Sequence, residues 1–303
     1  MTLPLVSKIY HKMICCLSTV SPTLTTKILY YNAFKRRLDL KNPKTLNEKL
    51  QYLKLHDYYE NPLVTQCADK YLVRDYVTDS GCSEILNELY NVWESADDII
   101  WDELPEKFVL KCNHGCGYNI ICDDKSKFNE SKVKEQLHKW MKEDFWKFSA
   151  ETNYRDIPKR IICEKYLQPS VGKLPEDYKV YCFNGKAEYV MVCIGREFGR
   201  PKFYYFDRNW SLQRLTKDGI EAPVDLSLEK PDGIDKVFYY AAELSKPFPF
   251  VRADFYLFDG QVYFGELTFT PGACLDNKRL PETDLMFGDM LYLKNINKKR
   301  EVM

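Results

Sequence analysis

The chain has 303 residues, so it can bury a large hydrophobic core without needing disulfides or a structural metal. It contains 44 Lys and Arg and 44 Asp and Glu, so it lacks the excess positive charge that is typical of nucleic-acid-binding proteins. We therefore expect no nucleic-acid partner, and we expect any anionic ligand to be bound by a local cluster of side chains. The 22 Tyr and 17 Phe favour a β-rich core.

The eleven cysteines predict reduced thiols, because the chain is long and shows no secretory signal peptide. The apolar stretch 13–20 is much shorter than the roughly 20 residues that span a bilayer, so we expect a cytoplasmic protein without a transmembrane segment. Residues 3–17 could form an amphipathic helix. This helix either packs on the protein itself or makes a peripheral contact with the inner face of the membrane. The sequence does not indicate an oligomeric state.

Residues 1–104 are predicted to form a helical N-terminal region. The pattern is helical from residue 24 to about residue 100, and Thr45 is the expected N-cap of a helix that starts at Leu46. Residues 69–74 resemble one amphipathic helix.

A strand pattern begins after Pro105. A short apolar strand, 108–110, runs into Lys111 and a loop that contains Gly115 and Gly117. Helical spacing follows over 129–148, and then another strand over 160–167. We expect residues 105–169 to form a small lobe and residues 170–303 a larger core lobe.

The larger lobe is predicted to be largely antiparallel sheet, with one helix over 233–245. The pairs Asn184-Gly185 and Asp259-Gly260 are typical two-residue hairpin turns. The expected strands cover residues 178–183, 187–194, 202–206, 253–258 and 262–267. The fold class is therefore α+β.

Lys111 and the loop after it could bind phosphate, because the strand delivers a cation and two glycines let backbone amides turn toward an anion. The spacing matches neither a Walker loop nor a dinucleotide fingerprint. A hairpin turn with an exposed lysine is the alternative.

The hairpin around Asp259-Gly260 carries four polar residues that we expect on one face, because they share sequence parity: Arg252, Asp254, Glu266 and Thr268. Two facing carboxylates favour a magnesium ion bound together with nucleotide phosphates, and Arg252 would then face the transferring phosphoryl group. A structural salt bridge from Arg252 to Asp254 or Glu266 is the alternative.

Five motifs are found in order along the chain: KNPKTLNEKL at 41–50, ADKY at 68–71, FVLKCNHGCG at 108–117, DYKVYCFNGK at 177–186 and FGELTFTPG at 264–272. Together they resemble the TupA-like branch of the ATP-grasp superfamily, which is associated with teichuronopeptide and surface-polysaccharide synthesis. The resemblance implies an ATP-grasp fold, in which two α+β lobes clasp ATP after the helical N-terminal region.

The resemblance also implies roles for individual residues. Lys111 would bind the α and β phosphates, and the loop 113–119 would form a lid that includes Asn113, His114, Gly115, Gly117 and Asn119. Glu164 and the backbone of Lys165, Tyr166 and Leu167 would hold adenine and ribose. Lys179 would be a second phosphate or substrate cation. The metal ligands would be Asp254, Glu266 and Thr268, where Thr268 replaces the Asn of many relatives.

Two of these side chains have further interpretations. His114 could donate to a phosphate or simply order the loop. Arg196 could clamp a substrate carboxylate or could be a solvated surface residue.

The implied activity is an ATP- and Mg²⁺-dependent ligase that joins a carboxylate to an amine through an acyl phosphate. Its substrates would be small-molecule or glycan acids and amines of a bacterial surface polysaccharide, and Arg252, Lys179 and Arg196 would be the catalytic cations. A glycosyltransferase or kinase that uses the same scaffold on a sugar hydroxyl is the alternative. A nucleotide-binding subunit without catalysis is a third possibility.

Overall fold

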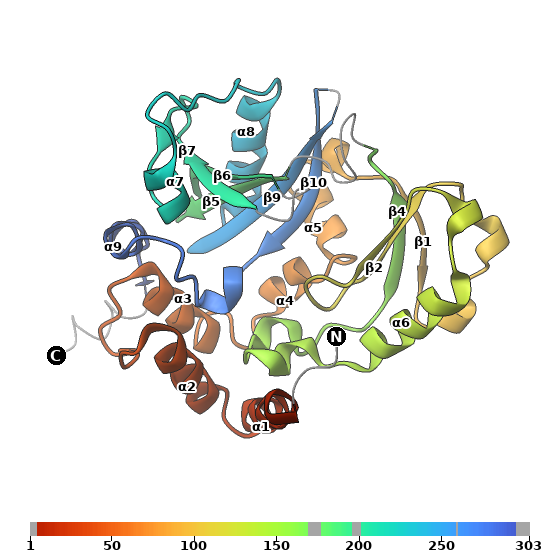
Figure 1. Ribbon diagram of the computed structural model, residues 1–303, viewed down its shortest axis with the longest axis horizontal. Coiled ribbons are helices and arrows are strands. Elements are labelled where there is room, and N and C mark those ends of the chain that lie inside the picture. The colour runs from red at the N-terminus through yellow and green to blue at the C-terminus, as the bar shows by residue number, and fades with distance from the viewer. Residues whose placement is uncertain (1–4, 169–176, 196–200, 259, 295–303) are drawn as a thin grey trace.

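The computed structural model describes residues 5–168, 177–195, 201–258 and 260–294. Two antiparallel sheets lie on either side of a helical middle (Figure 1). The α-helices are α1 (Leu5–Val20), α2 (Pro22–Phe34), α3 (Leu46–Leu55), α4 (Pro62–Ala68), α5 (Val73–Asp79), α6 (Glu130–Lys142), α7 (Lys217–Glu221), α8 (Ile234–Ser245) and α9 (Pro281–Met290). The strands are β1 (Leu89–Trp93), β2 (Phe108–Cys112), β3 (Asn119–Cys122), β4 (Ile161–Lys165), β5 (Asp177–Phe183), β6 (Lys186–Ile194), β7 (Lys202–Phe206), β8 (Leu212–Gln213), β9 (Phe250–Phe258) and β10 (Gln261–Thr268).

The smaller sheet has the strand order β1-β4-β2-β3. Helix α6 covers it, and Leu137 of this helix is fully buried with Leu110 and Ile161 from the strands. The predicted strands at 108–110 and 160–167 are confirmed, and the helical spacing over 129–148 resolves into α6 followed by the 3-10 helix Phe145–Phe148.

The larger sheet has the order β10-β9-β5-β6-β7-β8. The Asn184-Gly185 turn is confirmed, because Phe183 pairs with Lys186 and both turn residues have positive φ. Phe258 pairs with Gln261, so β9 and β10 form the second expected hairpin. Asp259 of its turn lies outside the described residues.

The two faces of the larger sheet have different chemistry because side chains alternate along each strand. Val180 and Cys182 are buried on the face that α8 covers, where the Cys182 thiol donates to the carbonyl of Ala241. Lys179 and Tyr181 lie on the opposite face. The predicted helix over 233–245 is confirmed as α8.

Two details of the helical N-terminal region differ from the prediction. Residues 89–93 form an edge strand paired with β4, because Tyr, Val and Trp within Leu89–Trp93 favour strand over helix. Residues 69–74 are not one helix, since the carboxylate of Asp69 accepts hydrogen bonds from the backbone of Tyr71 and Leu72 and the chain turns there before α5. The predicted N-cap Thr45 is confirmed as part of a capping box. The lobe boundaries at 104 and 169 stay predictions.

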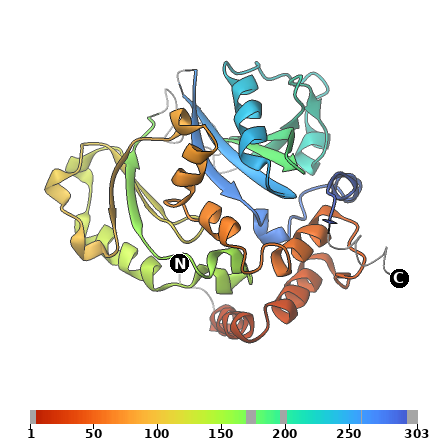
Figure 2. The ribbon, with the colours of Figure 1, turned by 180° about the vertical axis from the view of Figure 1, so that it is seen from behind.

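The turn between α4 and α5 lies between the two sheets, as the view from behind also shows (Figure 2). Helices α1 to α3 lie along one edge of the molecule, and α3 lies next to α9 (Figure 1). All eleven cysteines fall within the described residues and are free thiols. Within the described residues, no helix has the length and apolar character needed to cross a membrane.

Candidate functional site

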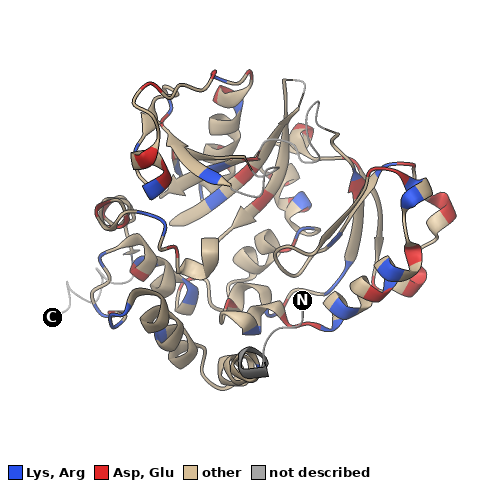
Figure 3. Cartoon of the chain, viewed as in Figure 1, with Lys and Arg blue, Asp and Glu red and all other residues tan. Residues whose placement is uncertain are grey.

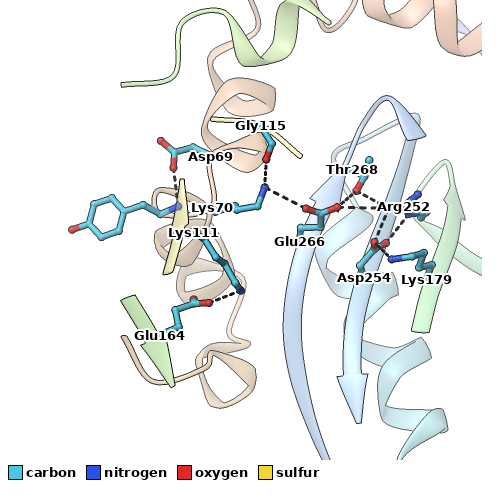
Figure 4. A network of polar contacts seen from close by, with 11 residues as sticks. Asp69, Lys70, Lys111, Gly115, Glu164, Lys179, Arg252, Asp254, Glu266 and Thr268 are labelled. Atoms are coloured by element: carbon cyan, nitrogen blue, oxygen red, sulfur yellow. Dashed lines mark hydrogen bonds and ion pairs between the residues drawn. The ribbon is translucent and has the colours of Figure 1, made fainter. Parts of the chain in front are cut away.

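A buried ion-pair cluster lies on the open face of β9 and its neighbour β5 (Figure 4). The guanidinium of Arg252 donates to both carboxylate oxygens of Asp254, at 2.7 and 2.6 Å. The ammonium of Lys179 donates to Asp254 at 2.7 Å and also pairs with Asp177. Burial opposes the charge of Lys179, but Asp254 and Asp177 outweigh it and raise the pKa of the lysine. The cluster therefore holds two cations, Arg252 and Lys179, against two buried carboxylates, Asp254 and Asp177.

Glu266 connects this cluster to the cleft between the sheets. Its carboxylate accepts a hydrogen bond of 2.9 Å from the hydroxyl of Thr268, and that hydroxyl accepts one of 3.1 Å from Arg252. Lys70 lies 3.4 Å from the other carboxylate oxygen. Burial acts to raise the pKa of Glu266, but Lys70 and Arg252 outweigh it and lower this pKa to about 2. Glu266 is therefore ionised at neutral pH.

Arg252, Asp254, Glu266 and Thr268 share one face of the hairpin, as expected. The reason is not that all four have even sequence numbers. A two-residue turn pairs Phe258 with Gln261, and this register would place Glu266 opposite Ala253, on the face toward α8. A β-bulge between Phe264 and Glu266 shifts the register by one residue, so that Glu266 pairs with Asp254.

Gly265 occupies the bulge, and a Cβ at this position would lie 2.8 Å from the carbonyl oxygen of Asp254. Such a contact is too short for any side chain, so the bulge requires glycine. Gly265 therefore determines that both carboxylates point into the same site.

Lys70 is the residue that the sequence analysis missed. It lies in the turn between α4 and α5, and its ammonium donates to the carbonyl of Gly115 at 2.6 Å while it pairs with Glu266. It therefore links the loop of the small sheet to the hairpin of the large sheet. The ADKY motif, which contains Lys70, could have pointed to this residue. The helix expected over residues 69–74, however, gave no reason to place the Lys70 side chain at the hairpin.

A cavity of about 140 Å³ lies at the other end of the hairpin, between the two sheets. Lys111 donates to Glu164 at 2.6 Å at its wall, and Arg74 lies 3.3 Å from the same carboxylate. The backbone of Lys165 is engaged, because its N–H donates to Glu88 and its carbonyl accepts from Asn87. The predicted residues Lys111, Asn119, Glu164, Lys165, Tyr166 and Leu167 all line this cavity, together with Asn87, Val109, Ile121, Tyr256 and Phe264.

Two predicted lid residues are not available to a ligand. Asn113 is fully buried, its amide donates to Asp69 and to the carbonyl of Pro158, and its oxygen accepts from the backbone of Arg160. His114 is buried beside the carbonyl of Trp140, and this burial lowers its pKa to about 4. In this structure both side chains order the loop, and their expected place among the nucleotide ligands stays a prediction.

The rest of the loop presents its tip to solvent. Gly115 is buried, and a Cβ there would meet the rings of Phe145 and Tyr118 within 3 Å. Cys116 and Gly117 are exposed, and Gly117 adopts a left-handed φ of 77° with open space around it. The loop is thus anchored at its base and free at Gly117.

A second cavity of about 350 Å³ adjoins the ion-pair cluster on the far side from the first. Lys179 and Arg252 line it, and Pro271 and Gly272 form one edge. Its remaining lining residues are Tyr181, Met191, Phe203, Tyr205, Thr216, Asp218, Leu275, Asp276, Asn277 and Lys278. Arg196 lies outside the described residues, so its expected contact with a substrate stays a prediction.

The donors Asp254, Glu266 and Thr268 fit magnesium in kind, because all are hard oxygen ligands and the two carboxylates pair directly across the hairpin. Within the described part of the chain, no group of three His, Cys, Asp or Glu side chains could hold a metal. A magnesium ion here would therefore need further oxygens from phosphate or water, which is its usual mode of binding.

Two of the solved structures that resemble this chain are ligases of low sequence identity. A D-alanine–D-alanine ligase from Bacillus anthracis complexed with ATP is 15% identical, with a TM-score of 0.47 over 78% of this chain and 68% of the ligase. An L-amino acid ligase from Bacillus licheniformis is 13% identical, with a TM-score of 0.42 over 83% of this chain and 56% of that one. No curated protein sequence matches the chain.

The motif resemblance noted above agrees with a comparison against family models. Residues 48–292 match the model described as TupA-like ATP-grasp, which covers both sheets, both cavities and the ion-pair cluster. The mixture of helix with two antiparallel sheets agrees with the expected α+β class. The chain therefore belongs to the TupA-like ATP-grasp family.

Proposed function

We propose that this protein is an ATP- and Mg²⁺-dependent ligase that joins a carboxylate to an amine, acting on a bacterial surface polysaccharide or its precursor. The observation that carries the proposal is the order of features along one face of β9. Tyr256 lines the smaller cavity, Asp254 pairs with Glu266 in the middle, and Arg252 lines the larger cavity. A nucleotide, a metal and an acid substrate would lie in this order for phosphoryl transfer in line.

The proposed role of each residue follows from its position relative to the two cavities. Lys111 and Lys70 lie on the nucleotide side and would neutralise phosphate charge, while Arg252 and Lys179 would stabilise charge that develops on the transferring group. Asp254, Glu266 and Thr268 would hold magnesium, which would offset phosphate charge and fix its orientation.

The proposed reaction has two steps. A substrate carboxylate oxygen attacks the γ-phosphorus of ATP and the bond to ADP breaks, which gives an acyl phosphate. An amine then attacks the acyl carbon, inorganic phosphate leaves and the nitrogen loses a proton. Since water would hydrolyse the acyl phosphate, the exposed loop tip at Cys116 and Gly117 would cover it. The link to surface polysaccharide is supported by the family resemblance alone.

The test is product analysis with candidate acids and amines. We expect ADP, phosphate and an amide by mass spectrometry, whereas a phosphorylated hydroxyl would identify a kinase instead. The double variant Asp254→Asn, Glu266→Gln should lose turnover by at least about 10³-fold. The control variant Asp225→Asn, Glu229→Gln removes the same charge from exposed positions and should keep normal turnover. Full activity in the first variant, with normal thermal unfolding, would exclude the proposed metal site.

A further inference from the structure

The N-terminal end of this neutral protein carries a local excess of positive charge. Residues 1–38 contain no Asp or Glu and six basic residues, namely Lys8, Lys12, Lys27, Lys35, Arg36 and Arg37. The remaining 265 residues consequently carry a net charge of −6. Arg36 is paired with Glu48 of α3, whereas Lys12, Lys27, Lys35 and Arg37 are exposed and have no ion pair among the described residues. In Figure 3 neither the described part of α1 nor α2 contains an acidic residue.

The same end exposes a row of apolar side chains. On α1, Ile9, Met13, Cys16 and Val20 follow the spacing i, i+4, i+7 and i+11, which places them on one face of the helix. Ile9 is 60% exposed, Met13 51% and Val20 78%. Cys16 is exposed as well. We call these four residues the α1 stripe.

The α1 stripe is held outward by contacts on the other side of the helix. Ile14 and Ser18 are buried, and the hydroxyl of Ser18 donates to the carbonyl of Lys147 at 2.8 Å. Helix α2 continues from α1 almost without a break, since the N–H of Ser21 donates to Leu17. Exposed Leu24 and Tyr31 extend the apolar surface along α2.

We propose that α1 and α2 dock this protein on an anionic lipid membrane. Each apolar side chain of the stripe would enter the boundary between headgroups and acyl chains, and lysines beside it would meet lipid phosphates, as in interfacial amphipathic helices. Each basic residue near such a surface strengthens binding to anionic lipid. The net charge of −6 on the rest of the chain would turn the α1–α2 end toward the membrane.

A second copy of the chain fits this surface poorly. Two copies that met through α1 and α2 would bring together two ends that each carry only positive charge. An acidic protein would satisfy the lysines but would leave aliphatic stripe residues such as Ile9 and Val20 without an apolar partner. A lipid surface satisfies both features. This inference goes beyond the proposed ligase activity and does not rest on it.

The experiment is flotation of the full-length protein with vesicles of phosphatidylcholine, with and without about one third phosphatidylglycerol. We expect binding only to the anionic vesicles, and at least tenfold weaker binding as NaCl rises from about 0.05 to about 0.5 M. The variant Met13→Glu, Val20→Glu should weaken binding at least tenfold. Its control, Ile220→Glu, Val224→Glu, alters exposed apolar residues of the large lobe and should bind within twofold of the unchanged protein.

The charge contribution is tested separately. Lys12→Gln, Lys27→Gln should weaken binding several-fold, whereas Lys139→Gln, Lys236→Gln, which loses the same charge elsewhere, should not. Equal binding to both kinds of vesicle, no binding to either, or unchanged binding of Met13→Glu, Val20→Glu would overturn the proposal. So would a dimer in light scattering that this variant dissociates, or capture by an acidic protein in place of lipid. Unfolding curves of all variants identify any loss that comes from misfolding.

Discussion

Replacing Lys70 with Met removes one cation from the junction of the two sheets and keeps most of the side-chain length. Two contacts are lost, the 2.6 Å hydrogen bond to the carbonyl of Gly115 and the 3.4 Å ion pair with Glu266. The Glu266 side chain is 29% exposed, so solvent screens the pair and its loss costs at most about 1 kcal/mol. With the hydrogen bond, we expect Lys70→Met to lower the free energy of unfolding by about 1–3 kcal/mol.

The functional loss should be much larger than the loss of stability. If Lys70 faces phosphate in the nucleotide complex, its removal should lower ATP turnover by about 10²–10³-fold. Lys125→Met is a matched control, because Lys125 also donates to a backbone carbonyl, that of Leu104 at 2.7 Å, and lies away from both cavities. It should lose similar stability in urea unfolding and keep turnover.

The same variant should also change the pH profile. Lys70 is the foremost of the charges that lower the pKa of Glu266, so its loss should move this pKa upward from about 2 toward the ordinary value. We expect turnover of the residual activity to fall at a higher pH than in the unchanged protein, and Lys70→Arg to restore both rate and profile in part. Turnover within twofold of normal in Lys70→Met would refute the role given to this lysine.

Three further predictions concern the loop, the bulge and the cavity wall. The folded-state pKa of His114 is about 4, below the 6.5 of the unfolded chain, so the stability it contributes is present above pH 6.5 and lost as the pH falls toward 4. His114→Gln should remove up to about 2 kcal/mol from the difference in unfolding free energy between pH 7 and pH 5, measured by urea unfolding. Gly265→Ala should abolish turnover and cost more than about 2 kcal/mol, whereas Gly260→Ala, with open space at the same hairpin, should cost about 1 kcal/mol and remain active. Glu164→Gln should raise KM for ATP about tenfold or more with a smaller change in kcat, measured by ADP release.

The sequence predicted most elements of the larger sheet because their signals are local. Asn184-Gly185 marks a turn whatever surrounds it, and the strands beside it alternate in a regular way. The strand Leu89–Trp93 was missed because its partner β4 lies about 70 residues away, and its surroundings read as helix. Tertiary pairing decided its conformation.

In the site, too, features set by neighbouring residues could be predicted, whereas features set by contacts with distant segments could not. The residues of the hairpin were identified, yet the shared face was derived from parity that a two-residue turn does not support. The bulge at Gly265 could have been suspected, because glycine inside a strand pattern often marks one. The burial of Asn113 and His114 could not, since it depends on Asp69, Pro158 and Trp140 from distant segments.

In the described structure every cation of the site is paired with a carboxylate, and the site has one cation more than it has carboxylates. The cations are Lys70, Arg74, Lys111, Lys179 and Arg252, and the carboxylates in contact with them are Glu164, Asp177, Asp254 and Glu266. Under the proposed function, a nucleotide triphosphate therefore exchanges one set of ion pairs for another, and does not enter a field of free positive charge. Lys111 would turn from Glu164 to phosphate, and Glu266 would turn from Lys70 to magnesium. Because Lys70 also donates to the carbonyl of Gly115, the ion pair of Glu266 and the position of the loop would change together, and occupation of the proposed metal site would be coupled to closure of the loop over the nucleotide.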